Sequence, residues 1–329
     1  MCKINIEVNK LIVSICCQTY NHKDYIAQAI ESFLMQKTNF SFEILLRDDA
    51  SNDGTAEICK EYAEKFPKAI NLLAYNENQY LKGVSPFRDN VKRAQGKYIA
   101  ICEGDDYWTD PYKLQKQVDF LEANDEYVLC HTNGYRNING RLKPWKEYFP
   151  NQGDIQEVFY HGTVVKTCSA LLRSSLINDF TKLYTKTNLS VGDWPLFAFY
   201  STKGKIGYIS DQTCVYRDNP NSISSVLSKK GYLKYSLSLI DVKRFLRDYI
   251  FINQLDTIYS EENLQLDSNY TLLKFYFDTF NYRETKTIKS LPLNAKSKRL
   301  IKYANNYFSF IVICLYRKFI REINKNDNK

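Results

Sequence analysis

The sequence predicts an α/β fold with a mostly parallel sheet flanked by helices, followed by a helical C-terminal region. Between residues 11 and 130, short apolar runs typical of strands alternate with segments of helical periodicity, which is the pattern of βαβ units. After about residue 228 the chain has few glycines and the segments 232–252 and 269–280 have helical composition. We therefore expect two domains, residues 1–228 and residues 229–329.

The first domain should alternate strands and helices in a regular order. Strands are predicted at residues 11–16, 42–47, 70–74, 98–102 and 127–130, and helices at residues 25–36, 55–66, 87–94 and 112–123. The first helix presents one apolar face to the sheet, made of Ile26, Ala29, Ile30, Phe33 and Leu34. Residues 136–159 contain Asn, Gly, Pro and aromatic residues, and we expect long loops or a small hairpin there.

Composition and charge narrow the classes of protein. Of the 329 residues, 44% are hydrophobic and 25% are charged, so the chain can bury a substantial core and is not disordered. The net charge of +8 favours anionic partners. Most of the excess lies in residues 274–329, which indicates a local cause, and we expect no nucleic-acid partner.

Cysteine usage and hydropathy indicate the compartment. The nine cysteines form no CxxC pair, and several of them lie in apolar runs, which predicts buried, reduced thiols. Their odd total also argues against a disulfide framework. The first ten residues are polar and lack the apolar stretch that export requires, so we expect a cytoplasmic protein. No apolar run reaches the roughly 18 residues of a membrane span.

Polar residues that could carry chemistry follow three of the predicted strands. The first strand leads into Thr19, Tyr20 and Asn21, the second into the acidic segment 48–55, and the fourth into Glu103, Gly104, Asp105 and Asp106. Because ligands of open parallel sheets bind beyond the carboxyl ends of the strands, we expect these residues to meet at one edge of the sheet.

Two interpretations of the acidic segments stay open on composition alone. Residues 48–55 have the Asp, Ser, Asn and Gly of a strand-to-helix turn, and the segment 103–106 could be a solvated turn. Acidic residues that follow two separate strands and meet at one edge nevertheless repel one another unless a cation or hydrogen-bond donors compensate. A divalent ion with oxygen ligands, Mg²⁺ or Mn²⁺, fits such a cluster, and no His/Cys spacing indicates zinc.

Together, the segments 14–21, 48–55 and 103–108 resemble glycosyltransferase family 2, which has the GT-A fold. The resemblance covers residues 11–225. It implies an inverting, nucleotide-sugar-dependent enzyme with Mn²⁺ or Mg²⁺ as cofactor. It also implies that Asp105 is the metal ligand, with Asp106 in support, and that Glu103 and Asp105 hold the outer positions of the DxD motif. The resemblance implies that Asp49 contacts the base of the nucleotide. It places the following residues in the donor site: Thr19, Tyr20, Asn21, Asp48, Asp49, Glu103 and Asp106.

Two later segments extend the resemblance. Residues 191–196 resemble the segment that supplies the catalytic base, which makes Asp193 the candidate to accept the proton of the acceptor hydroxyl. The alternative for Asp193 is a helix N-cap, because Pro195 follows closely. Arg217 is a candidate anion donor in the donor site, or it pairs with a carboxylate. Asn219 stands where many relatives carry His.

The expected function is that of a metal-dependent inverting glycosyltransferase. It would transfer a sugar from a nucleotide-diphosphate sugar, a UDP-sugar, to a saccharide or lipid-linked acceptor in surface glycan biosynthesis. Addition of a single sugar is expected because the Gln-x-x-Arg-Trp segment of processive relatives is absent. The alternatives are a sugar nucleotidyltransferase, although residues 18–23 lack the glycine-rich loop it would need, and a non-catalytic nucleotide-sugar-binding module.

The end of the chain carries a further prediction. Residues 307–316 form an apolar run that is followed by Arg317, Lys318 and Arg321. This segment either packs on the catalytic domain or makes a peripheral contact with the inner face of the cell membrane.

Overall fold

The computed structural model describes residues 11–145, 165–184, 192–218, 229–250, 260–278, 292–293 and 298. The chain divides into two compact units. The first, here the sheet unit, comprises Met1–Lys186 and Leu196–Pro220, and the second, here the helical unit, comprises Thr187–Pro195 and Asn221–Lys329. The functional assignment of the two predicted domains stays a prediction.

One sheet of nine strands forms the centre of the sheet unit, in the order β3-β2-β1-β4-β8-β6-β9-β5, with β7 paired to β6. The strands are β1 Leu11–Thr19, β2 Ser41–Asp48, β3 Ile70–Ala74, β4 Tyr98–Ile101, β5 Tyr107–Trp108, β6 Tyr127–Ile138, β7 Arg141–Pro144, β8 Ala170–Arg173 and β9 Lys205–Arg217. The pairs β1–β2, β1–β4 and β2–β3 are parallel, whereas β8 is antiparallel to both of its neighbours. The predicted α/β fold class is confirmed. The part of the sheet formed by β8, β6, β9 and β5 contains both parallel and antiparallel pairs.

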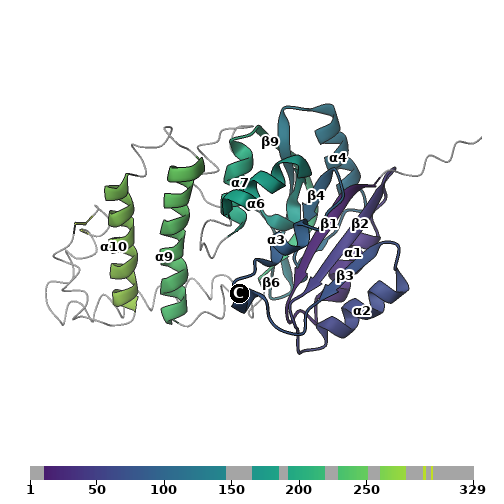
Figure 1. Cartoon of the computed structure of the whole chain (residues 1–329), viewed down its shortest axis with the longest axis horizontal. Helices are drawn as coiled ribbons and strands as arrows, with labels where there is room; N and C mark the ends of the chain where they lie inside the picture. The colour runs from purple at the N-terminus through teal and green to yellow at the C-terminus, as the bar shows by residue number, and fades with distance from the viewer. Residues whose placement is uncertain are drawn as a thin grey trace, which may run out of the picture. The chain divides into compact units, whose positions relative to one another are not determined.

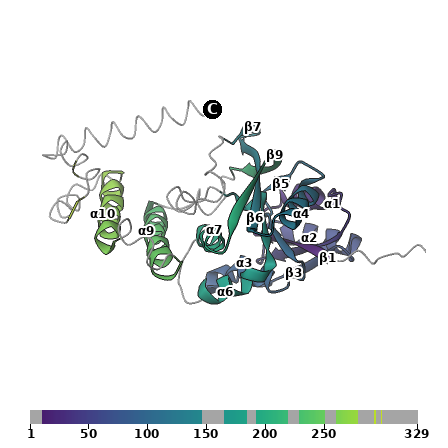
Figure 2. The same ribbon diagram turned by 90° about the horizontal axis from the view of Figure 1, so that it is seen from above.

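Helices cover both faces of this sheet. The described helices longer than one turn that precede β9 in the sheet unit are α1 Ile26–Leu34, α2 Thr55–Lys65, α3 Pro86–Val91, α4 Lys113–Ala123, α6 Ile177–Tyr184 and most of α7 Asp193–Ser201. Figures 1 and 2 show α1 and α4 on one side of the sheet, with α3 and α6 on the other. The predicted apolar face of α1 is confirmed, since Ile26, Ala29, Ile30 and Phe33 are fully buried in the main core.

The connections place a reversal of strand order beside β1. From β1 the chain passes to β2 and β3 on one side, and then returns by way of α3 to β4 on the other side. Right-handed crossovers put α3 on the face opposite to α1 and α2. The carboxyl ends of β1 and β4 therefore flank the switch point at which ligands of such sheets bind.

The segment after residue 130 forms a hairpin. The predicted strand 127–130 continues to Ile138, turns at Asn139 and Gly140, and pairs with β7. Both turn residues have positive φ, 50° and 82°, as a tight hairpin turn requires. A hairpin was one of the two alternatives left open by the sequence.

The helical unit contains α9 Lys229–Phe245, the π-helical segment Leu246–Ile250 and α10 Glu261–Asp278. Ion pairs link these elements: Arg244 and Arg247 contact Glu261, and Lys243 contacts Asp267. None of the described helices combines the length and apolar character needed to cross a bilayer. The apolar run 307–316, and with it the predicted membrane contact, lies outside the described residues.

Candidate functional site

The polar segments after β1, β2 and β4 lie at one edge of the sheet, as the sequence predicted. Thr19 is the strand partner of Asp48, and Cys16 is the partner of Ile101, so the three strands end at neighbouring positions. Backbone hydrogen bonds continue this alignment, because Asp49 N donates to Thr19 O over 3.1 Å and Gly104 N donates to Gln18 O over 2.9 Å. Carboxylates that follow β2 and β4 thereby come to the same edge.

Gly104 allows the turn after β4 to approach β1. A Cβ atom at this position would lie 2.7 Å from Thr19 Oγ1 and 2.9 Å from Ile26 Cδ1, which is too close for any other residue type. Beyond this contact, Asp105 Oδ2 lies 3.6 Å from His22 Nε2, and 16% of the Asp105 side chain is exposed. A partly exposed carboxylate and an imidazole therefore face each other at the switch point.

Glu103 and Asp106 turn to other partners. Thr167 Oγ1 donates to Glu103 Oε2 over 2.6 Å, and the backbone N–H of Arg217 donates to Asp106 Oδ1 over 2.8 Å. Asp106 is only 1% exposed, and burial, together with the neighbouring Asp105 and Glu103, raises its pKa well above the usual value. Within the described residues, no three His, Cys, Asp or Glu side chains are placed to hold a metal ion. The assignment of Asp105 as the metal ligand stays a prediction.

Arg217 stabilises residues 103–106, here the acidic turn. Its guanidinium carbon lies 4.9 Å from the ring centroid of Tyr25 and 4.4 Å from that of Tyr107. Nη1 donates to the backbone carbonyl of Asp105, and Nη2 donates to Gln28. These contacts place a cation against the backbone of the turn that carries the three acidic residues, and they help to fix the position of that turn.

The loops after β1 and β2 are fastened to each other. Asn21 N donates to Ser51 Oγ over 2.9 Å, and Asn21 Oδ1 accepts from Asn52 N over 3.0 Å. Asp48 is buried and accepts hydrogen bonds from the backbone and hydroxyl of Ser51. Asn21 and Ala50 have φ values of 55° and 62°, a strained conformation of the kind that collects at functional sites. Asn21 and Asp48 thus order the loops, and Tyr20 is 44% exposed beside them.

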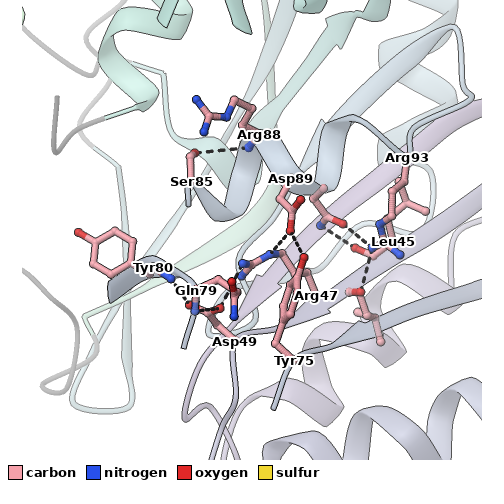
Figure 3. A network of polar contacts seen from close by, with 12 residues as sticks. Leu45, Arg47, Asp49, Tyr75, Gln79, Tyr80, Ser85, Arg88, Asp89 and Arg93 are labelled. Carbon is pink, nitrogen blue, oxygen red and sulfur yellow. Dashed lines mark hydrogen bonds and ion pairs between the residues drawn. The ribbon is translucent and has the colours of Figure 1, made fainter. Parts of the chain in front are cut away.

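Asp49 holds the segment that follows β3 (Figure 3). Its Oδ1 accepts from Gln79 N over 2.9 Å and its Oδ2 from Tyr80 N over 3.0 Å. The fully buried Arg47 also contacts Asp49, with Nη2 3.1 Å from Oδ1. Sequence reasoning did not single out Arg47, although an arginine in the otherwise apolar run of β2 was a signal. His22 was not singled out either.

Asp193 is the first residue of α7, Asp193–Ser201. Its Oδ1 accepts a hydrogen bond from the backbone N–H of Trp194 over 2.8 Å, so the carboxylate lies at the helix N-terminus. The same residue belongs to the helical unit, whereas the acidic turn belongs to the sheet unit. Its role as catalytic base stays a prediction.

A model of the family described as glycosyl transferase family 2 matches residues 14–181 of the chain. This match covers more than half of the sequence, and it includes the ends of β1, β2 and β4. The chain belongs to glycosyl transferase family 2. The predicted membership of this family is thus confirmed, and the match favours a glycosyltransferase over the nucleotidyltransferase and the non-catalytic module.

Two relatives illustrate the sequence similarity. An uncharacterized protein of Mycobacterium bovis is 30% identical over 218 residues, which are 64% of this chain and 60% of that protein. The UDP-Glc:alpha-D-GlcNAc-diphosphoundecaprenol beta-1,3-glucosyltransferase WfaP of Escherichia coli is 34% identical over 125 residues, or 38% of this chain and 46% of that enzyme. The chain thus matches less than two thirds of the length of either relative.

Two solved structures share the fold. TarS 1–349 of S. aureus, in complex with UDP-GlcNAc, aligns with a TM-score of 0.55 at 17% identity over 94% of this chain and 92% of that chain. The mannosyltransferase PcManGT of Pyrobaculum calidifontis, in complex with GDP-Man and Mn²⁺, aligns with a TM-score of 0.52 at 16% identity over 94% and 88% of the two chains. The α/β architecture of this chain is that of GT-A glycosyltransferases.

Proposed function

We propose that this enzyme transfers a single sugar from a nucleotide-diphosphate sugar to a saccharide or lipid-linked acceptor in surface glycan biosynthesis, with inversion at the anomeric carbon. The observation that carries the proposal is the position of Asp105, on a turn held against the end of β1 at the switch point of the sheet. UDP-sugars are the proposed donors, in keeping with the UDP-GlcNAc in the TarS structure and the UDP-Glc in the name of WfaP.

The donor set suits a divalent ion that needs few protein ligands. Mg²⁺ and Mn²⁺ are commonly bound by one or two protein groups and take their other ligands from water and substrate phosphates. Asp105 would supply a carboxylate oxygen, and His22 Nε2 offers an imidazole 3.6 Å away from it. A bound ion would supply Lewis-acid stabilisation of the charge that develops on the departing diphosphate. The Mn²⁺ in the PcManGT structure supports this assignment.

The remaining roles belong to side chains of this chain. Tyr20, with 44% of its surface exposed, would contact the nucleotide, and Thr19, whose buried Oγ1 has no hydrogen-bond partner in the described structure, lies beside the same turn. Arg217 would keep the turn in place and offset its negative charge. Asp193 would accept the proton of the acceptor hydroxyl as its oxygen attacks the anomeric carbon.

Calorimetric titration with UDP and with GDP, each with and without Mn²⁺, tests the proposal. We expect Mn²⁺ to strengthen nucleotide binding by the wild type, and we expect Asp105→Asn to remove that gain, because the amide is a poor ligand for a hard cation. The matched control is Asp119→Asn, which changes an exposed carboxylate on α4 and should leave binding unaltered. Equal gains in wild type and Asp105→Asn would refute the metal assignment. Turnover of UDP-sugars in a donor screen then identifies the sugar.

A further inference from the structure

The segment between β3 and α3, residues 75–85, and two carboxylates beside it converge on one buried side chain. This segment begins with Tyr75 directly after β3 and ends at Ser85, the N-cap of α3. It contains Tyr80, which is 42% exposed, and Leu81, which is 82% exposed. The segment starts at the edge of the proposed donor site, since Tyr75 N donates to Asp48 O over 3.1 Å.

Arg47 is the side chain that connects the three points (Figure 3). Its guanidinium is fully buried, with Nε 3.1 Å from Asp89 Oδ2 and Nη2 3.1 Å from Asp49 Oδ1. Its Cζ also lies 4.9 Å from the ring centroid of Tyr75, whose hydroxyl donates to Asp89 Oδ2 over 2.6 Å. Asp49 in turn accepts the backbone N–H groups of Gln79 and Tyr80. Arg47 therefore contacts the start of the segment directly at Tyr75, its middle by way of Asp49, and the helix that follows it at Asp89.

The charges explain why this cation is needed. Asp49 and Asp89 are 4% and 19% exposed at the side chain, and two poorly hydrated carboxylates repel each other without a cation between them. Burial opposes ionisation of Asp89, but hydrogen bonds from Tyr75 and Arg47 lower its pKa below the usual value. A guanidinium can contact both carboxylates at once, whereas the ammonium of lysine acts as a single point charge.

The same contacts change the expected role of Asp49. Its two oxygens already accept backbone N–H groups and face Arg47, so much of its hydrogen-bonding capacity is used within the protein. Asp49 thereby orders the Gln79–Tyr80 backbone. A residue that acts in this way is a positioning residue.

We propose that Arg47, with Asp89 and Tyr75, positions Asp49 and the Gln79–Tyr80 segment as one wall of the donor-nucleotide site, and so sets the affinity and base preference for the nucleoside diphosphate. This inference rests on the proposed function. None of the three residues needs to touch the donor.

Arg47→Lys is the first test, because it keeps the charge and removes the bridge between the two carboxylates. Its control is Arg93→Lys, which changes a second arginine near α3. Arg93 is half-buried, donates to Leu46 O, Asn71 and Asn90, and has no recorded hydrogen bond or ion pair with Asp49. We expect Arg47→Lys to weaken UDP binding on the order of tenfold and to reduce the ratio between UDP and GDP affinities. Arg93→Lys should keep both values, at a comparable loss of melting temperature.

Tyr75→Phe is a milder second test, because it removes only the hydroxyl that donates to Asp89. We expect a smaller loss of UDP affinity in the same direction. In turnover assays we expect a raised KM for the donor, with kcat nearly unchanged. Wild-type affinities for UDP and GDP in both Arg47→Lys and Tyr75→Phe, or an equal loss in Arg93→Lys, would overturn the inference while leaving the proposed function intact. Absence of nucleotide binding by the wild type would instead refute the proposed function itself.

Discussion

His131 should make the stability of this protein depend on pH between about 4 and 6.5. The side chain lies on β6, is 5% exposed, and its ring centroid is 5.2 Å from that of Tyr208. Burial lowers its pKa from 6.5 to about 4, with a smaller opposing effect of a backbone hydrogen bond at Thr132. In this pH range the unfolded chain binds a proton that the folded chain excludes, so folding stability falls as the pH falls.

The size of the effect follows from that difference in pKa. A fall of about 2.5 pKa units corresponds to roughly 3 kcal/mol of unfolding free energy, since each unit is worth about 1.4 kcal/mol. This stability is present above pH 6.5 and is fully lost near pH 4. The assay is urea unfolding at pH 4.5 to 7.5 for wild type and for His131→Phe, which has similar volume and no titratable group.

The difference between the two proteins isolates His131, because carboxylates titrate equally in both. We expect the wild-type free energy of unfolding to decrease towards acid pH more steeply than that of His131→Phe. His131→Gln, which keeps polarity without the titration, should behave like His131→Phe. Parallel pH profiles for all three proteins would show that His131 is protonated in the folded state as easily as in the unfolded chain, and would refute the reasoning.

Substitutions at three further positions test the packing around the site, each by chemical or thermal unfolding. Lys113→Ala should cost about 2–4 kcal/mol, because the fully buried side chain lies over the Trp108 ring, and Lys113→Met should restore most of this by refilling the space. Gly104→Ala should cost about 1–3 kcal/mol and also weaken UDP binding, because the new methyl group meets Thr19; unchanged UDP affinity would contradict this. Ala50→Gly should stabilise by roughly 0.5–1 kcal/mol, since glycine tolerates the φ of 62°.

Local patterns in the sequence predicted much of the sheet unit. Apolar periodicity located α1 and its buried face, and the bounds of β3 agree with the predicted strand 70–74. The extension of β6 to Ile138 was missed for a physical reason. His131, Thr132 and Asn133 are polar, which argued against a buried strand, but β9 lies beside them and covers them. A pairing between segments about 80 residues apart leaves no local signal.

The sequence predicted where the site lies, but not which of its carboxylates are engaged by hydrogen-bond donors of the chain. Parallel strands bring their carboxyl ends to one edge, so the convergence of Thr19, Asp48 and Asp105 followed from the strand assignments alone. Which carboxylate faces a ligand depends on donors that arrive from distant parts of the chain. Thr167 for Glu103 and Arg217 for Asp106 could not be read from spacing.

This division bears on how the enzyme would use a metal ion. Hydrogen bonds from within the chain engage Asp48, Asp49, Glu103 and Asp106, and Arg47 and Arg217 supply two cations nearby. Donors within the chain therefore satisfy part of this edge, while repulsion from Asp105 and Glu103 still raises the pKa of Asp106. On the proposed function, Asp105 offers an ion one carboxylate, and the diphosphate must supply further oxygen ligands. Metal and donor should consequently bind together, with Mn²⁺ affinity rising when UDP is present and UDP affinity rising by the same factor when Mn²⁺ is present, because such coupling is reciprocal.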